Sequence, residues 1–319
     1  MQYFEDILGQ ERACRLLMKT IENGNIHHAY LFTGPPGVGK FLTARAFARA
    51  ILLQHDPATD IYLQQNMHPD LLVIEKREDK TKILIEQIIQ ELEPWLATRP
   101  YRADRRIVII RDAHLLGLPA ANALLKTLEE PPAYAIIILI ADENTLTETI
   151  LSRCQELRFS PLNEAAISNY LIKQGIDIET SRRHARLSQG SLQMAAALSQ
   201  TEEEQDLWRL AGEIIRGLAS GHEIEVFLAA EKMETNPAII SSMLEIILRD
   251  LLVYQASGNS ELLLLPENLA LIQDIPAVQT AAVQEALFTL HRLREWYKTS
   301  VNSRLININI SYVVMDALK

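Results

Sequence analysis

The chain has 319 residues, a net charge of −10, 48% hydrophobic residues and 23% charged residues. This length predicts two or three domains, and the balanced composition excludes a disordered or low-complexity chain. The negative charge repels a phosphate backbone, so any contact with nucleic acid must be local or shared with partners. Cys14 and Cys154 are far apart in the sequence, which excludes a disulfide framework and a four-cysteine zinc site.

The N-terminal segment and the apolar runs indicate where the protein resides. The first residues, MQYFEDILGQERA, carry acids where a secretory signal would carry a basic segment followed by an apolar stretch. Apolar runs such as AIIILIA at 135–141 are far shorter than the ~20 residues of a membrane-spanning helix. We therefore expect a cytoplasmic protein with no membrane partner.

Residues 29–51 predict a strand, a glycine-rich loop and a helix in succession. AYLFT is a short apolar run, GPPGVGK is rich in turn-forming residues, and apolar residues then recur at helical spacing. Further continuous apolar runs predict strands covered on both faces, at 71–74, 107–110 and 135–140.

Helices are predicted between these strands. One lies near 84–97, and the other is AANALLKTLEE, which Pro131 and Pro132 terminate. The first of them has one apolar stripe, formed by Ile85, Ile88, Ile89, Leu92 and Leu96. Strands that alternate with helices predict an α/β fold with a parallel sheet.

Beyond 160 the pattern is helical to the end of the chain, interrupted only by loops. The apolar stripe of Ile239, Met243, Ile246, Ile247 and Leu251 would face a core or another subunit equally well. With boundaries near 160 and 206, we expect three domains, at 1–160, 161–206 and 207–319.

The loop GPPGVGK predicts a phosphate-binding site. Its glycines, Gly34, Gly37 and Gly39, let backbone N–H groups turn toward phosphate oxygens, and Lys40 reaches the terminal phosphates. The helix that follows presents its positive end to the same phosphates. A chance glycine turn is the alternative, but strand, loop, lysine and helix all occur in order.

The residues that would catalyse hydrolysis at this loop are absent. Phe41 occupies the position of the Ser or Thr that binds Mg²⁺, and Thr43 is two residues too late. Asp112, after the strand at 107–110, fits the metal-binding acid, but Ala113 follows it where a water-orienting glutamate is expected. His114 is more simply a packed or solvated residue than a substitute base. We therefore expect weak binding of ATP or ADP without turnover.

Several strings together resemble one family. They are FEDILGQERA at 4–13, the phosphate loop, HPDLLVIE at 68–75, NALLKTLEEPP at 122–132 and LSRCQELRF at 151–159. The chain is thereby similar to the clamp-loader subunits of bacterial DNA polymerase III, which belong to the AAA+ proteins. The resemblance implies an AAA+ P-loop core domain at 1–160, a helical lid at 161–206 and an all-α collar for oligomerisation at 207–319.

Departures from the family pattern favour its delta-prime type over its motor type. Phe41 and Ala113 are two, and Gln193 in GSLQ, where motor subunits carry arginine, is the third. A subunit without turnover would serve as a rigid stator for its neighbours. Many relatives carry a four-cysteine zinc module after the phosphate loop; the stretch 54–67 has no cysteine, so no zinc is expected, and His55 and His68 are read as ordinary loop residues.

Arg153, in the SRC string, matches the family's arginine finger, which acts in trans at the ATP site of an adjacent subunit. The alternative is local pairing with Glu148 or Glu156. The resemblance implies motor (gamma/tau) and delta subunits as partners, with the sliding clamp and primer-template DNA reached through the complex. A basic patch before the 107–110 strand is either solvated or in contact with the DNA backbone, and it consists of Arg99, Arg102, Arg105 and Arg106.

Three other functions stay open at this point. An active clamp-loader ATPase would use Thr43 or water as the replacement ligand for magnesium. A P-loop enzyme that transfers phosphate to a small molecule would need an acceptor-activating base, which no segment supplies. A structural adaptor without nucleotide is the third, because Phe41 could fill the site.

Overall fold

The computed structural model describes residues 3–142, 146–200, 204–298 and 301–319. The chain divides into two compact units, Met1–Ala196 and Ala197–Lys319. The predicted boundary near 160 falls inside the first unit, and residues 201–203 of the predicted lid lie outside the described residues. The three-domain division therefore stays a prediction.

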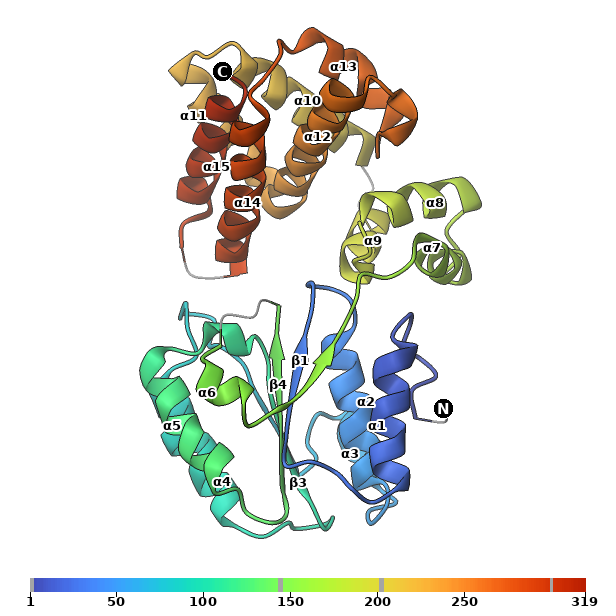
Figure 1. Ribbon diagram of the computed structural model, residues 1–319, viewed down its shortest axis with the longest axis vertical. Coiled ribbons are helices and arrows are strands. Elements are labelled where there is room, and N and C mark those ends of the chain that lie inside the picture. The colour runs from blue at the N-terminus through green and yellow to red at the C-terminus, as the bar shows by residue number, and fades with distance from the viewer. Residues whose placement is uncertain (1–2, 143–145, 201–203, 299–300) are drawn as a thin grey trace. The chain divides into compact units, whose positions relative to one another are not determined.

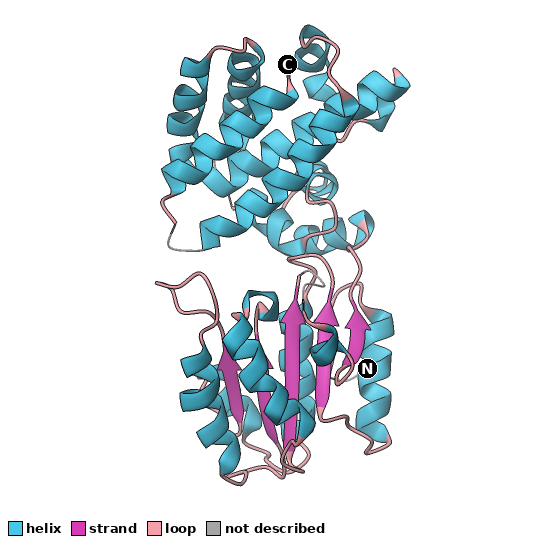
Figure 2. Cartoon of the chain, turned by 60° about the vertical axis from the view of Figure 1, so that its left-hand side comes forward, coloured by secondary structure: helices cyan, strands magenta, loops and turns pink. Residues whose placement is uncertain are grey.

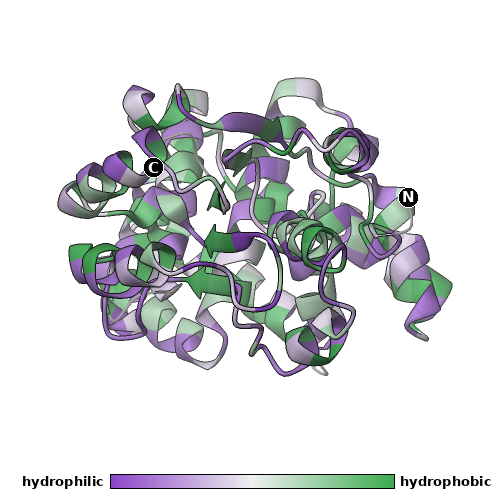
Figure 3. Ribbon diagram, turned by 90° about the horizontal axis from the view of Figure 1, so that it is seen from below, coloured by the Kyte–Doolittle hydropathy of each residue, from purple (hydrophilic) through white to green (hydrophobic). Residues whose placement is uncertain are grey.

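A five-stranded parallel sheet forms the centre of the first unit, in the order β2-β3-β4-β1-β5 (Figures 1 and 2). The strands are β1 (Ala29–Thr33), β2 (Leu71–Ile74), β3 (Arg106–Ile110), β4 (Ala135–Ala141) and β5 (Gln155–Arg158). Every residue of β1, β3 and β4 is buried, as their continuous apolar sequences predict, and Figure 3 shows strands in hydrophobic colours. β5 was not predicted, because only one of its four residues is buried and its sequence is mostly polar.

Helices cover both faces of this sheet, as Figure 1 shows. α1 (Glu11–Glu22) and α2 (Lys40–Leu52) pack on one face through residues such as Leu17, Phe47 and Ile51. α4 (Glu93–Ala97) and α5 (Leu118–Glu129) contribute Leu96, Leu124 and Leu128 to the core on the other face. The short helices α3 and α6 span Thr59–Gln64 and Glu148–Leu151.

The predicted helix near 84–97 differs from expectation in its middle. Residues Gln87–Leu92 form a π-helix, whose i→i+5 hydrogen bonds widen the turn, and α4 continues from it. The change in period breaks the predicted stripe: Ile88 and Leu92 are buried, whereas Ile89 is 46% exposed. The side chain of Gln87 fixes the start of this helix by donating to the carbonyl of Glu75 at the end of β2.

Three helices follow the sheet, as the sequence predicts beyond 160, and the last of them crosses the boundary between the two units. They are α7 (Glu164–Lys173), α8 (Ile178–Leu187) and α9 (Leu192–Ser199). Asn163 and Asp177 cap α7 and α8 by accepting from backbone N–H groups in their first turns. A small apolar cluster holds these helices together, formed by Leu162, Ile167, Leu171, Ala185 and Ala195.

The described residues of the second unit form helices joined by loops. Its α-helices are α10 (Glu204–Ala219), α11 (Glu223–Lys232), α12 (Pro237–Ser257), α13 (Leu269–Asp274), α14 (Thr280–Glu295) and α15 (Ser303–Ala317). The 3₁₀ turns of the chain are η2 (Ala113–Leu115), η3 (Met233–Thr235), η4 (Ser260–Leu262), η5 (Pro266–Asn268) and η6 (Trp296–Lys298). The stripe on α12 packs inward: Met243, Ile246 and Leu251 are at most 2% exposed.

The expected fold class is confirmed: an α/β unit with a parallel sheet precedes an all-α unit. Among the described residues, no helix combines the length and apolarity needed to cross a bilayer.

Candidate nucleotide site

The glycine-rich loop joins β1 to α2, as predicted. Gly34 has φ +141°, and a Cβ at this position would lie 2.3 Å from the carbonyl oxygen of Phe159, so only glycine fits. Gly39, also at positive φ, is the N-cap of α2, and no side chain caps that helix. The free N–H groups of its first turn and the positive end of its dipole suit a phosphate.

Lys40 is buried, and oxygen atoms surround its ammonium group. Its Nζ donates to the carbonyls of Gly34 and Pro35 at 2.6 and 2.5 Å, and it lies 2.8 Å from the carboxylate of Asp142, which follows β4. These carbonyl and carboxylate oxygens accept hydrogen bonds from the ammonium group, as the oxygens of a bound phosphate would. A nucleotide that uses Lys40 must therefore replace part of this set.

An aromatic ring and a guanidinium occupy the place of the magnesium ligand. Phe41 follows Lys40, and the guanidinium carbon of Arg111 lies 4.4 Å from the centroid of its ring. Arg111 also donates to Glu75 at 2.8 Å. The hydroxyl of Thr43, the replacement ligand that the sequence left open, is buried and donates to the carbonyl of Gly39. Phe41 offers Mg²⁺ no oxygen, and the only hydroxyl nearby in the sequence, that of Thr43, is buried.

Three further ligand-bearing side chains gather at the ends of β3 and β4. Ligand atoms of Asp112, His114 and Asp142 lie within 4.8 Å of one another. Asp142 already pairs with Lys40, and the Nδ1 atom of His114 accepts from the backbone N–H of Asp142. With the hydroxyl absent as well, this set does not fit the metal centre of a P-loop ATPase. Ala113, fully buried, supplies no base.

The start of α9 lies directly against the phosphate loop. Backbone N–H groups of Leu192 and Gln193 donate to the carbonyl of Gly37 at 3.0 and 3.4 Å. A Cβ on Gly37, which has φ +75°, would lie 2.1 Å from the hydroxyl oxygen of Ser191. The helix that carries Gln193 in place of a lid arginine is therefore seated on the loop by backbone contacts.

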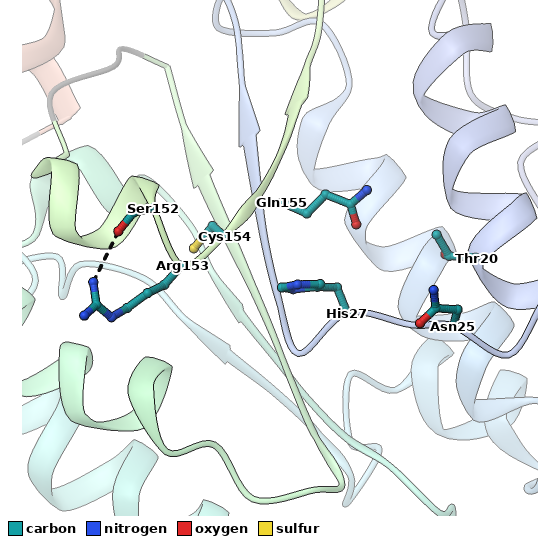
Figure 4. A pocket seen from close by; sticks show the side chains of 7 residues that line it. All are labelled: Thr20, Asn25, His27, Ser152, Arg153, Cys154 and Gln155. Carbon is teal, nitrogen blue, oxygen red and sulfur yellow. Dashed lines mark hydrogen bonds between the residues drawn. The ribbon is translucent and has the colours of Figure 1, made fainter.

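Arg153 lies in the turn after α6, beside a cavity of about 460 Å³. Its Nη2 donates to Glu129 at 2.7 Å, and its Nη1 donates to the carbonyl of Thr149 at 2.8 Å. Local pairing thus occurs, but with Glu129 rather than with the two acids considered from the sequence. Figure 4 shows the side chain turned toward Ser152, away from the Thr20 and His27 side of the cavity.

Three of the four arginines of the predicted basic patch make contacts with other residues of the chain. Arg102 pairs with Asp56 at 2.7 Å, Arg105 donates to the carbonyl of Ala133, and Arg106 is buried with its guanidinium over the ring of Trp95. Arg106 is therefore buried rather than solvated, whereas the side chains of Arg102 and Arg105 are 31% and 36% exposed, and contact of the patch with DNA stays a prediction.

Where many relatives carry cysteines, a buried polar network joins the loop to β2. Burial lowers the pKa of His68; its Nδ1 accepts from the N–H of Asp70, and its Nε2 lies 3.3 Å from Asp56. The carboxylate of Asp70 accepts three backbone N–H groups, from Tyr101, Arg102 and Ala103. His68 is thus a structural residue, and His55 pairs with Asp104 at the surface.

Sequence reasoning missed three residues of the site: Arg111, Glu129 and Asp142. Arg111 immediately precedes the predicted Asp112, and Asp142 follows the last apolar residue of β4. Their positions at the ends of predicted strands could have identified both as site residues. Glu129 is separated from Arg153 by 24 positions, and only the packing of α5 near α6 brings them together.

The sheet order, the glycine loop and the helix seated on it define the class: a P-loop protein of the AAA+ type. Residues 9–163 match the family described as DNA polymerase III, delta subunit. This segment, just under half of the chain, is thus similar to the subunits of the DNA polymerase III clamp loader.

The chain has similar sequence identity to delta' subunits and to tau subunits of DNA polymerase III. The DNA polymerase III subunit delta' of Bacillus subtilis is 32% identical over 61% of this chain and 60% of that protein. Subunit tau of the same organism is 31% identical over 61% of this chain and 35% of that protein. The matched segment thus spans less than two thirds of either relative. The structure of a gamma subunit-related protein from Thermotoga maritima aligns with 95% of this chain and 99% of its own, at 17% identity and a TM-score of 0.43, which is too weak to bear on function.

Proposed function

We propose that this chain is the delta-prime-type, stator subunit of a cytoplasmic DNA polymerase III clamp loader and does not hydrolyse ATP itself. The observation that carries the proposal is the stacked pair of Phe41 and Arg111, with Ala113 after the strand-end Asp112. Hydrolysis at a P-loop needs a metal ligand and a residue that orients water, and neither side chain supplies them.

The phosphate cradle has kept its glycines and its lysine. Gly34, Gly37, Gly39 and Lys40 would hold the phosphates of ATP or ADP, and Asp112 lies at the adjacent strand end. Binding is weak in this proposal, because the carbonyls and the carboxylate around Lys40 compete with phosphate oxygens. A bound nucleotide would thus stabilise the subunit without being turned over.

Arg153 acts in trans in this proposal, as the arginine finger of a neighbouring motor subunit. Arg153 lies in the turn between α6 and β5, and its side chain is 34% exposed. The partners are motor (gamma/tau) and delta subunits, which meet this chain through the collar at 207–319. The sliding clamp and primer-template DNA are reached through the complex.

The motor-subunit alternative requires Thr43 as the metal ligand. Thr43 is fully buried and lies two residues beyond the usual position of the metal ligand, so its hydroxyl is a poor ligand. No specific observation favours this alternative.

Reconstitution with motor and delta subunits tests the proposal. Replacing Arg153 by Ala should reduce ATP turnover of the complex by about 10³-fold if the finger follows the usual magnitude. Arg158→Ala is the matched control, because Arg158 lies in neighbouring β5, is 79% exposed and pairs with Glu156. Equal turnover with Arg153→Ala and wild type would overturn the finger assignment.

A further inference from the structure

We propose that Glu129 is the resting counter-ion of Arg153 and restrains it until phosphate takes the place of the carboxylate. This inference rests on the proposed function of Arg153 in trans. It assigns a regulatory role to the last residue of α5, in the string NALLKTLEEPP.

The contact geometry shows how Arg153 is held. Its Nη1 donates to the carbonyl of Thr149 and to the hydroxyl of Ser152, at 2.8 and 3.2 Å, so that end of the fork is bound to the turn of α6. The Nη2 end reaches across to Glu129 at 2.7 Å. Among the residues that the structure describes, Glu129 is the one anion that pairs with Arg153, and it lies on another helix.

The charges explain why this second contact is a restraint. With Glu129 in place, the pair has no net charge and presents little field to an incoming anion. The guanidinium is matched in geometry to carboxylate and phosphate alike, so the two compete for the same donors. A phosphate gains the full charge of Arg153 only after Glu129 leaves.

Solvent makes the exchange possible. The side chains of Arg153 and Glu129 are 34% and 50% exposed, and ion pairs this accessible to water are weak. The pair is therefore strong enough to bias the rotamer of Arg153 and too weak to lock it. For the same reason, it contributes little to the stability of the fold.

Glu129→Gln removes the charge and keeps the shape. Glu130→Gln is the matched control, because Glu130 is the next residue, is exposed and makes no side-chain contact with Arg153. In the complex reconstituted with motor and delta subunits, E129Q should raise ATP turnover about two- to fivefold, the range expected for loss of an exposed ion pair. E130Q should leave it unchanged, and neither change should move the melting temperature of the isolated chain by more than about 2 °C.

The double variant E129Q/R153A separates the two proposals. If Glu129 acts through Arg153, the double variant should turn over ATP at the rate of R153A alone. Turnover of E129Q at or below the wild-type rate, or an equal rise with E130Q, would overturn the restraint while leaving the finger intact. No effect of R153A would instead overturn the proposed function.

Discussion

The guanidinium carbon of Arg111 lies 4.4 Å from the centroid of the Phe41 ring. Phe41 comes directly after the phosphate-loop lysine, and Arg111 comes directly before the strand-end Asp112. An active P-loop ATPase holds Mg²⁺ between these two segments, through a hydroxyl and a carboxylate. Here the same segments are joined by an apolar ring and a guanidinium that is paired with Glu75.

Nucleotide binding to the isolated chain should be independent of magnesium. Because Phe41 offers Mg²⁺ no oxygen, calorimetric titration with ADP should give the same dissociation constant in Mg²⁺ and in EDTA, within about twofold. Phe41→Thr restores a hydroxyl, and Mg²⁺ should then tighten binding. Phe41→Ala is the control that removes the ring without adding a ligand; a magnesium effect as large as that of F41T would contradict the prediction.

Replacing Gly37 by alanine should weaken the contact between the phosphate loop and α9, whereas replacing Gly39 by alanine should not. Gly37→Ala introduces a Cβ against Ser191, whereas Gly39→Ala points into open space, and both positions have positive φ. Both variants carry backbone strain of about 1–2 kcal/mol, and G37A should lose about 1–2 kcal/mol more. Hydrogen exchange at the Leu192 and Gln193 amides should accelerate in G37A only. Equal exchange rates of these amides in G37A and G39A would contradict a packing contact between α9 and the phosphate loop.

The network around Asp56 should make the first unit sensitive to acid. The hydrogen bond from Arg102 lowers the pKa of Asp56 from 3.8 to about 2. Stability from this carboxylate is therefore fully present above pH 3.8 and is lost as the pH falls toward 2. Asp56→Asn should cost about 2 kcal/mol at neutral pH, because it leaves Arg102 without its anion, and should flatten the acid slope of stability.

Asp60→Asn is the matched control for this experiment. Asp60 lies on α3 and pairs with Arg49, but its side chain is 45% exposed, against 3% for Asp56. Water replaces an exposed partner easily, so D60N should cost about 0–1 kcal/mol in denaturant unfolding. A loss as large as that of D56N would show that burial does not set the strength of these pairs.

Continuous apolar runs predicted the buried strands from the sequence. The turn-forming residues of GPPGVGK predicted the glycine loop. β5 and the π-helix were not, because a polar edge strand and a change of helical period leave no simple mark in spacing. At the site, Phe41, Ala113 and Lys40 could be placed by their neighbours in the chain. The partners of Lys40 and Arg153 could not, since Asp142 and Glu129 are brought to them by the sheet and by α5.

The most direct measurement is ATP hydrolysis by the purified chain alone, with Mg²⁺ in excess and ADP binding recorded on the same sample. With Phe41 and Ala113 in place of the metal ligand and the water-orienting acid, turnover should not exceed the background rate while nucleotide still binds. Rapid hydrolysis that stops when magnesium is chelated would contradict the account.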